Sequence, residues 1–368
     1  MSNKNTQKDL FVRIVRRSSM PIPLAWTIRG ISMLLALLLS ALLIYTITKL
    51  DPIEVYKSLF NGVFGNKMRS WNTFKDVAFL LCISVGLAPA FKMRFWNIGA
   101  EGQVLMGGIA TAACMLYLAA LPTPLLFLCM IASSLLAGAL WALIPAAFKA
   151  NFGTNETLFT LMMNYVAIQI TSFLVSKWEN PFGSNTVGII NSLTRAGWFP
   201  SVGGQKYGLN VIIVLVLTVF MFIYLKYTKQ GYEIAVVGES VNTARYAGIN
   251  VKKTMIRTML ISGAVCGLAG FVAVSGASHT ISVDTAGGRG FTAIIVAWLS
   301  KFNTPMMILV SLLIVFLENG ADRIATDFGL NEHASEIISA IILFFVLGSE
   351  FFINYKLVFR SKREEVTE

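Results

Sequence analysis

The sequence predicts an all-α, polytopic membrane protein with about ten transmembrane helices. Of its 368 residues, 55% are hydrophobic and only 13% are charged, which is much less charge than a soluble domain of this size carries. Apolar runs long enough for a helix to cross the hydrocarbon core of a bilayer recur along the whole chain. The core of such a protein consists of spans packed side by side.

The apolar runs give ten candidate spans. In chain order they are 31–49, 76–91, 99–120, 125–148, 155–176, 208–227, 257–278, 288–300, 304–320 and 335–353. The runs at 76–91 and 288–300 are too short to cross without their flanking residues, and short or glycine-broken segments in both halves of a transporter indicate a path near the midplane. Two sets of five spans would have opposite orientations, which allows an inverted repeat of two five-helix halves.

Positive charges predict the orientation. A basic N-terminus (1–30) and a tail (354–368) in the cytoplasm place about two thirds of the 30 Lys and Arg residues on that side, as the positive-inside rule requires. The transmembrane domain, 31–353, then carries an extracytoplasmic loop at 177–207 and a cytoplasmic loop at 228–256. The net charge of +11 is assigned to the membrane surface, and no nucleic acid is expected, because no basic stripe with interleaved aromatic residues is present.

The sequence lacks the motifs of several catalytic classes. It contains no GxxxxGK[ST], HExxH or GxSxG motif, and its four cysteines lie in apolar runs without a CxxC pair. We therefore expect no metal, no cofactor and no enzymatic activity in this chain. A membrane-bound enzyme would need an acidic metal motif, and an ion-coupled secondary transporter would need an ionisable residue in the middle of a span. Glu101, Glu156 and Glu318 lie close to the ends of spans instead.

Three polar stretches stand out between the apolar runs. In KMRFWNIGAEGQ, Asn97 is placed to cap the next helix, and Gln103 enters an apolar span where it needs a partner or a water-filled path. Thr160 and Asn164 in NETLFTLMMNY share one helix face, and DTAGGRGFT supplies a flexible, glycine-rich segment. Helix packing and interhelical hydrogen bonds are the alternative explanation for each. The predicted pathway residues are Asn97, Glu101, Gln103, Thr160, Asn164, Arg289 and Thr292.

Four motifs in a fixed order carry a family resemblance. They are WNIGAEGQ, NETLFTLMMNY, GYEIAVVGESVNTARYAGINVKKT and GRGFTAIIVAWLSKFN, and the likeness extends from about residue 30 to residue 350. Together they resemble the integral-membrane permease of bacterial ABC importers in the ribose, branched-chain amino acid and nucleoside group. The chain is most similar to the larger of the two permeases in nucleoside (guanosine-type) uptake systems.

The resemblance implies a permease subunit in the bacterial cell membrane that forms the path for a nucleoside by alternating access. It implies four kinds of partner: a second, different permease, cytoplasmic ATPase subunits that hydrolyse ATP, an extracytoplasmic substrate-binding lipoprotein, and the small-molecule substrate. A permease for a sugar or another small polar solute of the same group is one alternative. An ion-coupled secondary transporter is another.

The cytoplasmic loop is the predicted contact with the ATPase. A short helix is expected from Ser240 to Tyr246, with Ser240 as N-cap and Gly248 at its end. The resemblance makes the segment matching 231–250 the coupling segment, and an ordinary connecting loop is the alternative. The residues assigned to coupling are Gly238, Glu239, Asn242, Ala244, Ala247 and Gly248.

Overall fold

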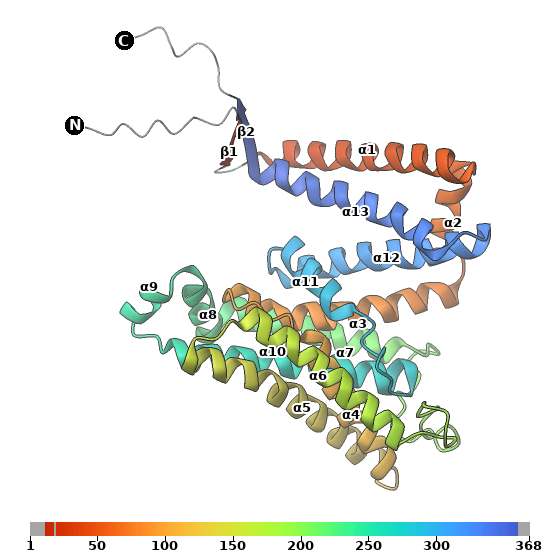
Figure 1. The fold of residues 1–368 in the computed structure, drawn as a ribbon, viewed down its shortest axis with the longest axis vertical. Helices are drawn as coiled ribbons and strands as arrows, with labels where there is room; N and C mark the ends of the chain where they lie inside the picture. The colour runs from red at the N-terminus through yellow and green to blue at the C-terminus, as the bar shows by residue number, and fades with distance from the viewer. Residues whose placement is uncertain (1–11, 18–19, 360–368) are drawn as a thin grey trace. The chain divides into compact units, whose positions relative to one another are not determined.

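The computed structural model describes residues 12–17 and 20–359, and within them the chain is almost entirely helical (Figure 1). The extreme ends of the predicted cytoplasmic segments, 1–11 and 360–368, and residues 18–19 lie outside the described residues. The chain divides into two compact units. The first comprises Met1–Gly65 and Leu317–Glu368, and the second comprises Asn66–Phe316.

The first unit joins the two ends of the chain. Its elements are β1 (Val12–Arg16), α1 (Ile22–Thr48), α2 (Pro52–Phe64), the second half of α12 (Thr304–Phe328), α13 (Glu332–Asn354) and β2 (Tyr355–Phe359). Strands β1 and β2 form an antiparallel ribbon, and α1 packs against α13, where Arg29 forms an ion pair of 2.5 Å with Glu350. The sequence predicted neither the ribbon nor α2. Helix α1 begins at Ile22, nine residues before the predicted span, with Pro21 as its N-cap.

The second unit contains the remaining helices. They are α3 (Lys67–Lys92), α4 (Ala100–Tyr117), α5 (Thr123–Phe152), α6 (Glu156–Lys177), α7 (Gly208–Tyr227), α8 (Lys229–Glu239), α9 (Val241–Tyr246), α10 (Val251–Ala273), a π-helical turn (Val274–Ser278), α11 (Arg289–Leu299) and the first half of α12.

Helix α10 is the centre of the second unit, since it packs against α3, α4 and α5. Glycines permit this close approach. A Cβ atom on Gly267 of α10 would lie 2.2 Å from the Ser134 carbonyl oxygen of α5, and one on Gly107 of α4 would lie 2.2 Å from the Gly267 carbonyl oxygen. These helices therefore meet backbone to backbone, which fixes the position of the polar segments between them.

The prediction of a polytopic all-α protein is confirmed. In the described part of the chain, seven helices are long and apolar enough to cross a membrane: α1, α3, α5, α6, α7, α10 with its π turn, and α12. The run at 76–91 reaches a spanning length through its flanking residues, as expected: α3 begins at Lys67, where the Asn66 side chain accepts the Arg69 N–H at 2.8 Å, and it is 26 residues long. The run at 288–300 does remain short, as the 11-residue α11. The inverted repeat stays a prediction.

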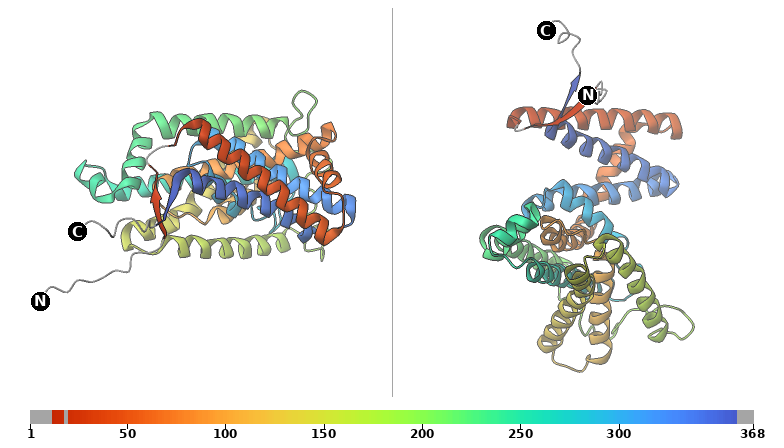
Figure 2. Two further views of the ribbon diagram at one scale, coloured as in Figure 1. Left: turned by 90° about the horizontal axis from the view of Figure 1, so that it is seen from above. Right: turned by 60° about the vertical axis from the view of Figure 1, so that its left-hand side comes forward.

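The two long loops lie at opposite ends of the second unit. Figure 1 shows α8 and α9 at one end of the helices and the segment 178–207 at the other, and both views in Figure 2 agree. The predicted placement of these loops on opposite sides of a membrane is consistent with this arrangement.

Candidate functional site

The first polar motif forms a buried amide pair where α4 begins. Asn97 Nδ2 donates to Gln103 Oε1 at 3.3 Å, and Gln103 Nε2 donates back to Asn97 Oδ1 at 3.2 Å. Asn97 Nδ2 also lies 3.3 Å from Ser262 Oγ of α10. All three side chains are buried, so they satisfy one another inside an apolar region. The N-cap lies two residues after the predicted one: α4 begins after Gly99, whose N–H donates to Asn97 Oδ1 at 3.1 Å.

The second motif, on α6, holds the backbone of the first. Asn164 Oδ1 accepts the Gly102 N–H at 2.9 Å, and Asn164 Nδ2 donates to the Ile98 carbonyl oxygen at 2.8 Å. Thr160 Oγ1 accepts the Ile98 N–H at 3.1 Å. Both side chains point to one segment, as the helical spacing predicted. They are engaged with the chain's own backbone, and their contact with a substrate stays a prediction.

The third motif is held by Glu101. Its carboxylate accepts the Gly288 N–H at 2.7 Å and the Gly290 N–H at 2.8 Å, at the point where α11 begins. The first N–H groups of a helix have no partner within the helix and carry its positive dipole end, so a carboxylate is well suited to them. A Cβ atom on Gly290 would lie 2.6 Å from the Glu101 nitrogen, so only glycine fits there. The one acidic residue in α4 thus joins α4 to α11.

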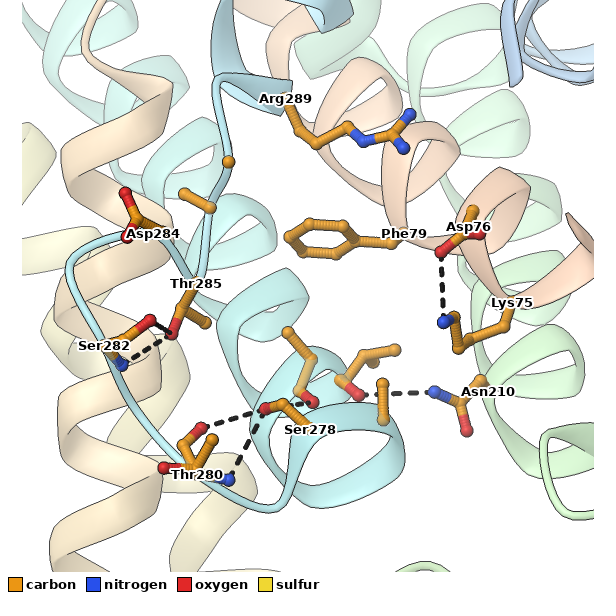
Figure 3. A pocket seen from close by; sticks show the side chains of 15 residues that line it. Lys75, Asp76, Phe79, Asn210, Ser278, Thr280, Ser282, Asp284, Thr285 and Arg289 are labelled. Carbon is orange, nitrogen blue, oxygen red and sulfur yellow. Dashed lines mark hydrogen bonds and ion pairs between the residues drawn. The ribbon is translucent and has the colours of Figure 1, made fainter. Parts of the chain in front are cut away.

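A cavity of about 310 Å³ lies beside this junction (Figure 3). Its wall includes residues 75–79 of α3, the first turn of α7, the end of α10 with the π turn, and the loop 280–288. Figure 3 shows the Phe79 ring in the middle of the view, Arg289 above it, the Lys75–Asp76 ion pair on the right and Asp284 on the left. The two charged atoms of that pair, Lys75 Nζ and Asp76 Oδ1, are 3.2 Å apart.

The cavity combines an aromatic ring with hydrogen-bonding groups of both kinds. Asn210 Nδ2 donates to the Val272 carbonyl oxygen at 3.3 Å, whereas its buried Oδ1 has no hydrogen-bond partner among the described residues. A buried acceptor of this kind costs free energy unless a ligand or water donates to it. Such a mixture, an apolar surface with a few convergent polar groups, is typical of sites for small polar ligands.

The structure therefore places the predicted pathway residues in three positions. Arg289 lines the cavity. Asn97, Glu101, Gln103, Thr160 and Asn164 form the buried hydrogen-bonded support behind it, and Thr292 lies in the first turn of α11, where its Oγ1 is 3.5 Å from the Gly288 carbonyl oxygen. The residues that sequence reasoning missed are Lys75, Asp76, Phe79, Asn210 and Ser262. The sequence did contain a signal for this cavity in Lys75 and Asp76, because charged residues within a membrane-spanning helix are costly and therefore indicate a functional site.

The segment 228–256, predicted to be a cytoplasmic loop, contains the expected short helix, α9, whose N-cap Ser240 accepts the Thr243 N–H at 3.2 Å. Gly248 follows it with a φ of +75°. Of the residues assigned to coupling, Gly238 and Ala244 are buried within the chain, whereas Glu239, Asn242, Ala247 and Gly248 are exposed. Tyr246, which was not predicted, is 93% exposed. The two buried residues can only position the segment, and the exposed ones are available to a partner.

Long apolar helices around a buried polar centre define the class of this molecule: it is a multi-pass membrane protein. Residues 72–347 match the family described as "Branched-chain amino acid transport system / permease component". The chain belongs to this family, which confirms the resemblance seen in the four motifs and the predicted role as a permease component.

Several curated relatives are similar over most of their length. The guanosine ABC transporter permease protein NupP of Bacillus subtilis is 30% identical, over 91% of this chain and 95% of its own. The nucleoside ABC transporter permease protein NupB of Lactococcus lactis is 29% identical, over 80% and 84%. The glucose ABC transporter permease protein TsgB13 of Haloferax volcanii is 26% identical, over 93% and 92%.

Proposed function

We propose that this chain is the permease subunit of an ATP-driven importer and that it forms part of the path of a nucleoside. The observation that carries this proposal is the similarity to a guanosine permease along 91% of the chain. A second relative is named for nucleosides and a third for glucose, so a sugar is the second candidate substrate.

The cavity beside Arg289 supports the nucleoside. A nucleoside joins a flat aromatic base to a hydroxyl-rich sugar, and the Phe79 ring offers a face on which a base stacks. Asp76 and Asp284 accept hydrogen bonds from base N–H or sugar O–H groups, and Asn210 Oδ1 provides a further acceptor. The loop that carries Asp284 and Arg289 is attached through Glu101 to α4, so movement of α4 against α11 would reshape this cavity. Alternating access requires such a change.

The proposed partners are inferred from the missing phosphate-binding motif and from the exposed surface of α8 and α9. With no phosphate-binding motif of its own, the permease depends on cytoplasmic ATPase subunits for ATP hydrolysis. The exposed residues of α8 and α9, with Tyr246 prominent among them, form a short helical surface that suits a groove on a soluble partner. The loop 178–207, at the opposite end, then faces the extracytoplasmic binding lipoprotein, and a second, different permease completes the path. Both termini are cytoplasmic in this arrangement.

Uptake measurements test the proposal. A bacterial strain without the importer is complemented with the full set of subunits, and uptake of labelled guanosine and labelled glucose is compared. We expect guanosine uptake, and we expect Phe79→Ala to reduce it about tenfold, which corresponds to about 1.4 kcal/mol. Phe220→Ala is the matched control, since Phe220 lies on α7 outside the cavity and is 62% exposed.

Two outcomes would contradict the proposal. Uptake of glucose without guanosine would favour the sugar permease. Guanosine uptake that is unchanged by Phe79→Ala would remove this cavity from the path, although the family assignment would stand.

A further inference from the structure

A second cavity, of about 480 Å³, lies where α3 and α7 end and where α8 and α12 begin. It is separate from the cavity beside Arg289 and shares no residue with it. Three lysines line it, Lys92, Lys226 and Lys301, and none of the described residues in its wall is acidic. Three positive charges around one cavity without a carboxylate create a site that attracts an anion.

The geometry leaves the ammonium groups of Lys92 and Lys226 able to bind further acceptors. Lys92 Nζ donates to the Leu225 carbonyl oxygen at 3.2 Å, which uses one of its three N–H donors. Lys226 Nζ lies 5.1 Å from the centre of the Phe222 ring and 5.2 Å from that of Tyr227. These ring contacts hold the Lys226 charge in place without neutralising it.

Thr304 adds an unpartnered hydroxyl at the start of α12. This residue lines the cavity and is 2% exposed, and its Oγ1 is buried without a hydrogen-bond partner among the described residues. A buried hydroxyl without a partner costs free energy, which an acceptor oxygen in the cavity would recover. Because Thr304 is also the first residue of a 25-residue helix, the positive end of the helix dipole favours a negative ligand at the same place.

One wall of the cavity is apolar. Phe222 and Leu225 lie on the last turns of α7, and Phe302 stacks on Phe91 of α3 with ring centres 6.3 Å apart. Both α3 and α7 are candidate membrane spans that end within the cavity wall, so the cavity lies at the edge of the hydrocarbon region. Cationic groups next to apolar surface at this depth match the boundary between a lipid headgroup and its glycerol.

We propose that this cavity binds the phosphate group of an anionic phospholipid. The phosphate lies among Lys92, Lys226 and Lys301 and accepts a hydrogen bond from Thr304, while the glycerol region contacts Phe222 and Leu225. A free phosphate ion has the same charge chemistry, but it does not use the apolar wall. The proposal does not depend on which solute the permease transports.

Lipid retention tests it on the intact importer complex. The complex is placed in nanodiscs of phosphatidylglycerol and phosphatidylcholine, extracted into detergent, and the lipids retained by the permease are measured by native mass spectrometry. We expect phosphatidylglycerol to be retained in preference to phosphatidylcholine by about tenfold, as expected for a difference of about 1.4 kcal/mol. We expect the Lys226→Gln/Lys301→Gln variant to lose this preference.

Two further variants make the result specific. Thr304→Val keeps the charges and nearly the same shape, and it should weaken retention several-fold if the hydroxyl binds the headgroup. Lys206→Gln removes a cation from the loop at the other end of the helices and should leave retention unchanged. Since Lys226 is exposed, its replacement should not disturb folding.

The proposal is overturned if wild type retains both lipids equally or if Lys226→Gln/Lys301→Gln retains as much phosphatidylglycerol as wild type. A second arm adds millimolar inorganic phosphate to complexes in phosphatidylcholine alone and measures protection of Lys226 from acetylation. Protection by phosphate, without selective retention of phosphatidylglycerol, would assign the site to the free ion and reject the lipid.

Discussion

At the scale of single residues, Glu101 determines how the proposed transport site is held together. Its carboxylate accepts the N–H groups of Gly288 and Gly290, which lie almost two hundred positions further along the chain. The sequence could place Glu101 in the first turn of a helix, because a carboxylate is favourable there. It could not identify the distant glycines, because no local pattern records which helix start a carboxylate will meet.

Replacing this carboxylate with an amide should loosen the junction. In Glu101→Gln one of the two N–H groups loses its acceptor, and hydrogen bonds to a charged group contribute about 2 kcal/mol. We expect lower thermal stability in detergent and faster hydrogen exchange at the Gly288 and Gly290 amides. Glu179→Gln is the control, because Glu179 accepts the Asn185 N–H at 3.1 Å in an exposed loop. Equal effects of the two substitutions would contradict a special role for Glu101.

His279 provides a prediction about pH. Its ring stacks on Trp198 with centres 3.8 Å apart, and burial together with the nearby Lys206 lowers the pKa of His279 to about 4, from a usual value of 6.5. The backbone carbonyl groups of Ser275 and Val274 act in the opposite direction but more weakly. Because the folded state resists protonation, the free energy of unfolding is unaffected above pH 6.5 and falls as the pH drops from 6.5 towards 4.

Between pH 7 and pH 5 this residue should lower the free energy of unfolding by about 1 kcal/mol, because solvent screening reduces the full effect of the pKa shift. Thermal unfolding in detergent at both pH values measures the loss. In His279→Gln, which does not titrate, the difference between the two pH values should be smaller by that amount. If the variant shows the same pH dependence as wild type, His279 is not the responsible group.

At the scale of elements, α8 depends on a backbone contact with α3. A Cβ atom on Gly238 would lie 2.2 Å from the Lys92 carbonyl oxygen. The two helix ends therefore touch directly, and movement of α8 is transmitted to the end of α3 without an intervening side chain. In the predicted coupling, Gly238 would therefore position the segment against α3 and would not itself touch the ATPase.

The substitution Gly238→Ala should push α8 away from α3. Overpacking of this kind costs about 1–3 kcal/mol, and we expect both a lower unfolding temperature and less ATPase co-purifying with the permease. Gly348→Ala, in α13, is the matched control, because a Cβ there has nothing within 4 Å. Wild-type ATPase recovery with Gly238→Ala would show that this contact does not position the coupling segment.

The elements that sequence reasoning found and missed differ in a physical way. Long apolar runs such as α5 and α7 were found, because their composition alone marks them as spans. Helix α2 was missed, since its buried residues Val55 and Leu59 alternate with polar ones and form no apolar run. The length of α3 was underestimated because Lys75 and Asp76 interrupt its hydrophobicity, although they pair with each other at the cavity.

At the scale of the whole molecule, the composition was sufficient for the class of protein, and the order of four motifs was sufficient for the family. The cavity beside Arg289 was beyond reach, because its walls come from four segments that are adjacent only after folding. The same limit applied to the lysine cavity, whose residues come from helix ends far apart in the sequence.

Accessibility labelling tests the proposed orientation of the whole chain. Leu193, in the loop 178–207, is 97% exposed, and Tyr246 is 93% exposed. In a background without the four native cysteines, a membrane-impermeant maleimide should label Leu193→Cys in intact cells and Tyr246→Cys only after lysis. The reverse pattern would place α9 outside the cell and would reject the proposed contact with a cytoplasmic ATPase.

The ribbon of β1 and β2 constrains how many times the chain crosses the membrane. Val12 lies opposite Phe359, and Arg16 lies opposite Tyr355. A two-strand ribbon has open edges that cannot reside in hydrocarbon, so we propose that the stretch before the first crossing and the stretch after the last share one aqueous compartment. The total number of crossings must then be even. The seven long apolar helices among the described residues make an odd number, so on this proposal at least one further helix, such as α4, α13 or α11 with its preceding loop, completes a passage of its own.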